Sequence, residues 1–226
     1  MHFSNLNWMQ VEDYLKKDNR LMIVVGATEQ HGYLSLAADT KIPLAMAEAA
    51  GEKSGVLVAP PINFGCSPYF LAYPGTISLR VSTLLAVEED LIRSAYGQGF
   101  RRFLILNGHG GNTCVKVFLD ELANDLPEMQ TRWYAWWQTQ TVESIAAKHD
   151  LPMGHANWEE AFPFTRVADL PDADKPPVEI EGAANTKHVR ELIGDGVFGG
   201  PYQASDDIMD EIFDACVADI LELLDF

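Results

Sequence analysis

The chain has 226 residues, 47% of them hydrophobic, a length and composition typical of one globular domain and not of a disordered segment. It carries 16 Lys and Arg against 33 Asp and Glu, and the resulting net charge of −17 would repel nucleic acids and anionic membranes. No apolar run reaches the ~18 residues that span a bilayer, and the first residues do not resemble a secretion signal. We therefore expect a single cytoplasmic domain over residues 1–226 that binds a neutral or cationic small molecule, with no nucleic-acid or membrane partner.

Short runs rich in Val and Ile alternate along the chain with amphipathic stretches, a pattern typical of parallel strands connected by helices. The predicted strands cover residues 21–27, 56–62, 102–108 and 131–137. The predicted helices lie near residues 42–53, 83–98 and 114–126, with Ser82 and Asn112 as N-caps, and over residues 206–224. The fold class is therefore α/β. Residues 168–200, rich in Pro, Gly and Asp, are predicted to form a long surface excursion that serves as a lid or a subunit contact.

The residues that follow the first strand are of the types that bind metals. In open parallel sheets, active sites form at the carboxyl ends of the strands. Glu29 and His31, in the sequence GATEQHG, are two residues apart and point to the same side of an extended segment, and Asp39 can return to them after a short loop. Two carboxylates and an imidazole suit Zn, Mn or Fe. From this segment alone, it is equally well supported that Glu29 is a surface charge and His31 an ordinary loop histidine instead of metal ligands.

A glycine-rich turn follows the third strand. In the sequence NGHGGN, His109 is framed by glycines, which allow positive φ and leave room for a ligand near the main chain. An anion-binding loop is the competing interpretation, but neither a Lys-Ser/Thr pair after the last glycine nor a G-x-G-x-x-G pattern is present. We therefore interpret His109 as a further metal ligand.

The third ligand-rich segment is GHANWEE, at residues 154–160. We expect a loop here that opens into a helix over residues 161–167, so that His155 and Glu160 reach one pocket. Since adjacent helical residues cannot both face inward, one of Glu159 and Glu160 is expected to be solvated. The alternative for this segment alone is an acidic helix start stabilised by the helix dipole.

Together these motifs resemble the creatininase family of metal-dependent amidohydrolases. GATEQHG, AAD, YPGTISL, NGHGGN and HANWEE occur in the order of the family pattern, and GVFGGP with the acidic last helix is similar to the family's C-terminal end. The resemblance implies a three-layer α/β/α fold with a mostly parallel central sheet, assembled as a homo-oligomer, commonly a hexamer.

The resemblance also implies two divalent metal ions per chain, either Zn, Mn or Fe. Asp39 would bridge the two ions, with Glu29 and His109 completing one site and His31 and Glu160 the other. Such a pair of ions would activate a water molecule and polarise the scissile carbonyl. His155 would then move the proton to the leaving nitrogen, so that His155 and Glu160 form the catalytic set.

Several positions depart from the family pattern and change the pocket wall. The loop HGYLSLAAD is one residue shorter than the usual one and lacks its second histidine. Creatininases proper carry Tyr and a metal-binding Glu where Gly110 and Gly111 stand, and many relatives have histidine at Phe70. The substrate and the choice of Glu160 over Glu159 as ligand therefore stay open.

Aromatic residues near the third and fourth strands are candidates for a flat pocket that binds a ring or a cation. Residues 133–137 hold three tryptophans, for which a place in the core or at a subunit interface is the alternative. We predict that the substrate contacts Gly110, Tyr73, Trp136 and Trp158.

The predicted function is divalent-metal-dependent hydrolysis of a C–N bond in a small amide or cyclic amide, creatinine-like or formamide-like. One alternative keeps the metal centre but cleaves a C–C or C–O bond of a cyclic keto-polyol. Another is a non-catalytic binding module on the same fold, because fold alone does not determine activity.

Overall fold

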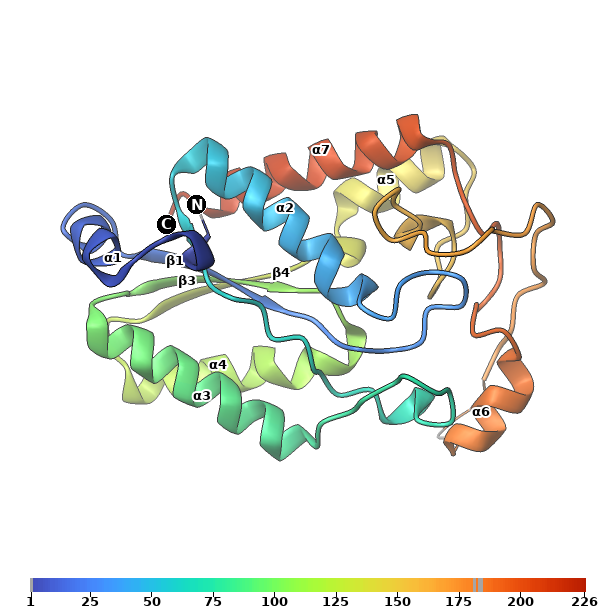
Figure 1. Cartoon of the computed structure of the whole chain (residues 1–226), viewed down its shortest axis with the longest axis horizontal. Coiled ribbons are helices and arrows are strands. Elements are labelled where there is room, and N and C mark those ends of the chain that lie inside the picture. Colours follow the sequence, from blue (N-terminus) through green and yellow to red (C-terminus); the bar gives the residue numbers. More distant parts are fainter. Residues whose placement is uncertain (1, 181, 183–184) are drawn as a thin grey trace.

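A computed structural model describes residues 2–180, 182 and 185–226 of the chain. Its centre is a sheet of parallel strands in the order β2-β1-β3-β4 (Figure 1). The strands are β1 (Arg20–Val25), β2 (Leu57–Val58), β3 (Arg102–Asn107) and β4 (Gln130–Ala135). The predicted α/β class with a parallel sheet is confirmed.

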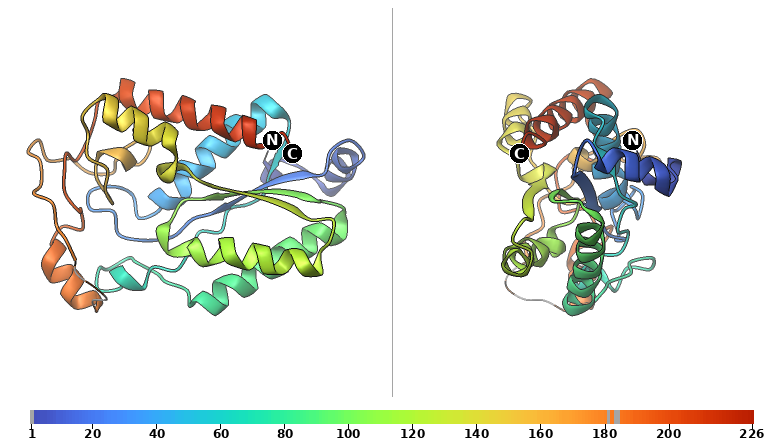
Figure 2. Two further views of the ribbon diagram at one scale, coloured as in Figure 1. Left: turned by 180° about the vertical axis from the view of Figure 1, so that it is seen from behind. Right: turned by 90° about the vertical axis from the view of Figure 1, so that its left-hand side faces the viewer.

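Helices cover both faces of the sheet, which makes three layers (Figures 1 and 2). One face is covered by α2 (Ala38–Ser54), α5 (Gln140–Lys148) and α7 (Asp206–Leu223), the other by α3 (Val81–Gln98) and α4 (Thr113–Asp125). The short helix α1 (Trp8–Leu15) lies near the two termini, whereas α6 (Thr186–Ile193) lies at the opposite end. Among the described residues, no helix is both long and apolar enough to cross a bilayer.

The side chains of each strand point alternately to the two faces of the sheet, which explains why the core has two layers. In β1, Met22 and Val24 pack into the cluster formed with α2 and α7, while Ile23 and Val25 pack into the cluster formed with α3 and α4. Because both faces are buried, the strand is a continuous apolar run with no polar alternation. This continuous apolar pattern is what predicts β1 and β3 from the sequence.

The edge strand β2 is much shorter than the predicted strand over residues 56–62. Pro60 and Pro61 have no backbone N–H to donate to a ladder, so pairing with β1 stops after Val58. The chain returns to β1 only at Ile62, whose N–H donates to the carbonyl of Val24 at 2.9 Å.

Two helix predictions are wrong in their details. Helix α3 begins at Val81, with Arg80 and not Ser82 at the N-cap position. No helix covers residues 161–167, because Pro163 cannot donate the amide hydrogen that a continuing helix requires. The segment instead makes the single 3-10 turn η5 (Trp158–Glu160), followed by a turn closed by the N–H of Thr165 on the carbonyl of Phe162.

The surface excursion over residues 168–200 contains helix α6 and packs against the short turn η2 (Pro68–Phe70). Val189 and Ile193 of α6 share a small hydrophobic cluster with Phe70 and Tyr73. The excursion therefore lies at the end of the sheet to which the carboxyl ends of the strands point. Residues 181, 183 and 184 of this prediction lie outside the described part of the chain.

Candidate metal centre

Close backbone approaches bring three segments together at the carboxyl end of the sheet. A Cβ at Gly108 would lie 1.7 Å from the main-chain oxygen of Asp39, so only glycine lets β3 end directly against the first turn of α2. The side chain of Asn107 accepts from the N–H of His109 at 3.2 Å and donates to its carbonyl at 2.8 Å. The glycines and the asparagine of NGHGGN thus hold His109 beside Asp39.

Asn112 occupies the N-cap position of α4, as predicted, but its side chain does not cap that helix. It accepts from the N–H of Cys66 at 3.1 Å and donates to the carbonyl of Gly26 at 3.0 Å. Asn112 therefore ties together the loops that follow β1 and β2.

One group of metal-type side chains contains Glu29, Asp39 and His109, all buried. His109 Nδ1 lies 3.3 Å from Asp39 Oδ2, and His109 Nε2 lies 3.4 Å from Glu29 Oε2. His109 Nε2 is also near the Cys66 carbonyl, at 2.9 Å, and the Ser67 hydroxyl, at 3.2 Å.

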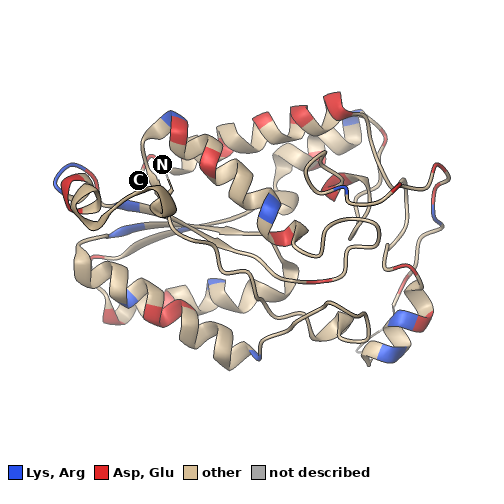
Figure 3. Cartoon of the chain, in the orientation of Figure 1, with Lys and Arg blue, Asp and Glu red and all other residues tan. Residues whose placement is uncertain are grey.

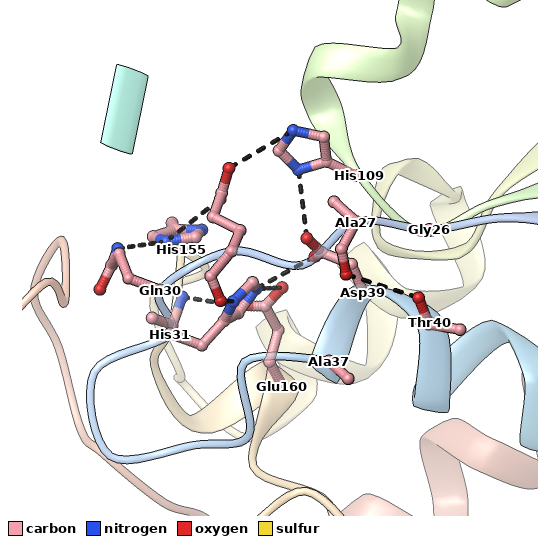
Figure 4. A network of polar contacts seen from close by, with 12 residues as sticks. Gly26, Ala27, Gln30, His31, Ala37, Asp39, Thr40, His109, His155 and Glu160 are labelled. Carbon is pink, nitrogen blue, oxygen red and sulfur yellow. Dashed lines mark hydrogen bonds and ion pairs between the residues drawn. The ribbon is translucent and has the colours of Figure 1, made fainter. Parts of the chain in front are cut away.

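A second group contains His31, Asp39 and Glu160 (Figure 4). His31 Nε2 lies 3.0 Å from Asp39 Oδ1 and 3.5 Å from Glu160 Oε1. His31 Nδ1 contacts the main-chain oxygen of Glu29 at 3.1 Å, which directs Nε2 toward the carboxylates. Asp39 therefore belongs to both groups, offering one oxygen to each histidine.

The chemistry of this donor set fits divalent cations. Both carboxylate oxygens of Glu29, Nε2 of His31 and Oδ2 of Asp39 are buried, and within the described residues they have no hydrogen-bond partner. Unpaired buried polar atoms cost on the order of 1–3 kcal/mol each, so native proteins rarely keep them without a reason. Carboxylate oxygens and imidazole nitrogens that converge in this way are ligands of Zn, Mn and Fe.

Burial and opposite charges shift the protonation of the whole cluster. Burial raises the pKa of Glu29 to about 7. Burial also acts to raise the pKa of Asp39, but the charges of His31 and His109 outweigh it and hold that pKa well below its usual value. Burial acts to lower the pKa of His109, but Asp39 outweighs it and raises the pKa to about 9. The charges of Asp39 and the histidines therefore stabilise one another, whereas burial destabilises the charged form of Glu29.

His155 lies beside the cluster, with Nε2 at 3.8 Å from Glu29 Oε1. Its ring stacks on Phe70, with centroids 4.7 Å apart and planes inclined by 12°. Gln30 Oε1 accepts from the N–H of Gly32 at 3.1 Å, which leaves Gln30 Nε2 to donate to His155 Nε2 at 2.9 Å (Figure 4). Burial, followed by the charge of His31, lowers the pKa of His155 to about 4, so the ring is neutral with an unprotonated Nε2.

A cavity of about 470 Å³ opens onto these groups. Its wall includes Gly110, one of the residues predicted to contact the substrate, and Phe198 from the excursion. Trp137 also lines it, whereas the neighbouring Trp136 is 1% exposed and packs in the core against Phe162.

Three of the residues predicted to contact the substrate do not line this cavity. Trp136 and Trp158 are core residues, and the indole N–H of Trp158 donates to the carbonyl of Pro152 at 2.7 Å. Tyr73 packs in the cluster of α6 and η2 instead of facing the cavity. Bulky side chains here fill the space between the helices and the sheet, a role that an aromatic pattern alone does not distinguish from ligand binding.

Glu159 and Glu160 are both buried, at 4% and 9% exposure, so the prediction that one of them is solvated is wrong. The prediction assumed an α-helix, but the 3-10 turn gives the two side chains other directions. Burial, followed by the charge of Glu160, raises the pKa of Glu159 well above its usual value. Sequence reasoning also missed Gln30 and Phe198, although Gln30 lies inside the GATEQHG motif and Phe198 inside the GVFGGP segment.

The three-layer fold and the buried carboxylate and histidine cluster are those of an α/β/α protein with a metal-type site. The family model for creatininase, described as creatinine amidohydrolase, matches residues 4–224. The chain belongs to the creatininase family, and its relatives support a hydrolase.

Among these relatives, the creatinine amidohydrolase of Pseudomonas putida is 34% identical over 206 residues, covering 77% of this chain and 78% of the relative. The 3-dehydro-scyllo-inosose hydrolase of Thermotoga maritima is 30% identical over 167 residues, covering 71% of this chain but only 54%, about half, of the relative. The solved structure named creatininase Mn superposes with a TM-score of 0.81 at 24% identity, covering 99% of this chain and 96% of the other, which shows the fold.

Proposed function

We propose that the protein is a divalent-metal-dependent amidohydrolase that cleaves a C–N bond in a small amide or cyclic amide. The observation that carries the proposal is the Asp39 carboxylate shared between the Glu29–His109 group and the His31–Glu160 group. The likeness to a creatinine amidohydrolase over most of its length supports the choice of a C–N bond.

The residues assigned to the metal are the five predicted ones. Glu29, Asp39 and His109 would hold one ion, and His31, Asp39 and Glu160 the other, with Zn, Mn and Fe compatible with these ligands. When bound, such ions supply Lewis acidity, which lowers the pKa of a water molecule and polarises the substrate carbonyl.

We assign the proton transfers to His155. Gln30 Nε2 donates to His155 Nε2 and so holds the ring with this nitrogen unprotonated; once that hydrogen bond is released, Nε2 would accept a proton and later return it to the leaving nitrogen. The stacked ring of Phe70 and the edge-on ring of Phe198, whose centroid lies 5.2 Å from that of His155, limit its motion and its access to bulk water. Phe70 and Phe198 thus position His155 at the rim of the cluster.

The metal content of the purified protein and its hydrolysis of small linear and cyclic amides test the proposal together. We expect about two divalent ions per chain and amine release that stops on chelation and returns with metal. Asp39→Asn and His109→Ala should each abolish metal retention and hydrolysis while leaving the fold intact. The exposed Asp207→Asn and His188→Ala are the matched controls and should behave like the parent protein. Asp39 and His109 variants that fold and keep the metal content and the activity of the parent protein would refute the assignment of these residues as metal ligands.

The second candidate function is hydrolysis of a C–C or C–O bond in a cyclic keto-polyol. It is favoured by the 30% identity to the inosose hydrolase, although that match spans about half of the relative. The same metal ligands would serve. A product that contains a new acid but no released amine would favour this candidate over the amidohydrolase.

A further inference from the structure

Two of the three free cysteines, Cys66 and Cys114, both lie against the backbone of Gly111. Cys66 belongs to the loop after β2, and its carbonyl oxygen would lie 1.9 Å from a Cβ at Gly111. Its N–H donates to the side chain of Asn112 at 3.1 Å. Cys114 lies in the first turn of α4, and its Sγ donates to the carbonyl of Gly111 at 3.9 Å. Segments that are distant in the sequence thus bring these cysteines to one point of the fold.

The two thiols are neighbours in the apolar cluster that α3 and α4 form with the sheet. Burial raises the pKa of the Cys66 thiol to about 11, and Cys114 acts in the same direction through its charge and through a hydrogen bond between the two side chains. Because such a bond acts only at short range, the sulfur atoms lie close to each other. Disulfides form between cysteines whose side chains meet in this way.

The two thiols differ in their access to solvent. Cys114 is half-buried, whereas Cys66 is 3% exposed. Since the oxidation of a thiol depends on its exposure, an oxidant in solution reaches Cys114 first. A thiol buried among apolar side chains is inert toward reagents in bulk water, so Cys66 is suited to react with a group already attached to Cys114.

The charge of the surface selects among oxidants. The chain carries 33 Asp and Glu against 16 Lys and Arg, and acidic residues recur over the helices (Figure 3). Such a field repels anionic oxidants, for example a disulfide that carries carboxylates. A neutral hydroperoxide approaches without this repulsion.

We infer that Cys66 and Cys114 are a site of oxidative modification, at which a hydroperoxide converts the two thiols into a disulfide. The Cys114 sulfur attacks the peroxide, so that an S–O bond forms, the O–O bond breaks, and with hydrogen peroxide a water molecule leaves. The Cys66 sulfur then attacks the resulting sulfenic acid. An S–S bond forms, the S–O bond breaks, and the hydroxide leaves as water with the proton of Cys66. The thiols are oxidised by two electrons, and the peroxide is reduced.

The modification would lie in the wall of the cavity, because Cys66 and Gly111 both line it. The crosslink would join the loop after β2 to helix α4, next to the carbonyl of Cys66 that contacts His109 Nε2 at 2.9 Å. The inference does not depend on the proposed function, since it requires neither metal nor amide hydrolysis.

Hydrogen peroxide acting on zinc-loaded protein at neutral pH, followed by alkylation of the unfolded chain and trypsin digestion, tests the inference. Trypsin places the three cysteines on separate peptides, residues 54–80, 103–116 and 191–226. The number of free thiols should fall from three to one, and mass spectrometry should find the first two peptides joined with the loss of two hydrogens. Cys216, in the core on the other face of the sheet, is the internal control and should be alkylated.

Three variants separate the two steps. Cys66→Ser should leave Cys114 as a sulfenic acid, which dimedone traps, because the second thiol is missing. Cys114→Ser should leave Cys66 as a free thiol after the same exposure to peroxide. Cys216→Ser is the matched control and should form the crosslink as the parent protein does.

Several results would overturn the inference. A parent protein that keeps all three thiols, or that oxidises Cys114 to the sulfinic acid without a crosslink, would show that the two sulfurs do not react together. A disulfide that joins two chains or includes Cys216 would place the modification elsewhere. Oxidation of Cys66 in Cys114→Ser at the rate of the parent would contradict the assigned order of attack.

Discussion

Replacing Gly108 by alanine should displace the shared carboxylate of the cluster. The added Cβ would lie 1.7 Å from the main-chain oxygen of Asp39 and 2.8 Å from its carbonyl carbon. Contacts under 3.0 Å force a shift, so the first turn of α2 and the end of β3 must separate by about 1.3 Å, the difference between 3.0 and 1.7 Å. Both are backbone segments in a packed core, and overpacking of this kind costs about 1–3 kcal/mol.

The displacement should affect metal binding more than stability. A metal site tolerates errors of about 0.2 Å in its ligand distances, and Asp39 belongs to both groups of ligands. We expect Gly108→Ala to retain well under one ion per chain and to lose hydrolysis, with a melting temperature lower by roughly 2–12 °C. Elemental analysis and thermal unfolding with and without added metal measure the two effects separately.

Gly110 provides the matched control in the same turn. A Cβ there would meet no atom within 4 Å, and its φ is not positive, so Gly110→Ala should keep metal and stability near those of the parent. Normal metal content in Gly108→Ala, or an equal loss in both variants, would refute the argument that close approach at Gly108 positions Asp39.

Three further predictions concern the buried Glu88 and the adjacent Trp136 and Trp137. Burial raises the pKa of Glu88 to about 8, so between about pH 5 and 8 the folded state binds more protons than the unfolded state, and stability falls by about 1.4 kcal/mol per pH unit as the pH rises. Glu88→Gln should therefore stabilise the protein at pH 8 relative to pH 5 in urea unfolding, and a parallel pH dependence in variant and parent would contradict this. Trp136→Ala should cost about 3–5 kcal/mol of stability because Trp136 is a core residue. Trp137→Ala should instead chiefly lower amide hydrolysis, because Trp137 lines the cavity, and the reverse result would exchange the two roles.

The layered fold followed from local patterns. A strand buried on both faces needs apolar residues throughout, so β1 and β3 are recognisable from their own six residues. The spacing of Glu29 and His31 and the glycines around His109 likewise describe short segments. These features depend only on residues that are neighbours in the chain, so the sequence alone is sufficient to predict them.

Predictions from local sequence patterns were wrong where the backbone departs from regular helix or strand geometry. The adjacent Glu159 and Glu160 were expected to diverge on a helix, but Pro163 prevents one and the 3-10 turn buries both. Edge strand β2 was overestimated for the same reason, because Pro60 and Pro61 interrupt an apolar run that otherwise resembles a strand. In both cases the irregular segment contains proline, which has no amide hydrogen to donate.

Which side chains face the cavity depended on the tertiary structure alone. Trp136 and Trp137 are adjacent and chemically alike, yet one packs against Phe162 in the core and the other lines the cavity. Phe198 reaches His155 across 43 positions of sequence, from the GVFGGP segment, whose sequence does not indicate that it contacts the cluster. The sequence thus determined which chemical groups are available and on which strands' ends they lie. Their grouping around Asp39 and the wall that encloses them arise only when distant segments pack, because burial and contact are properties of the folded chain and not of any one segment.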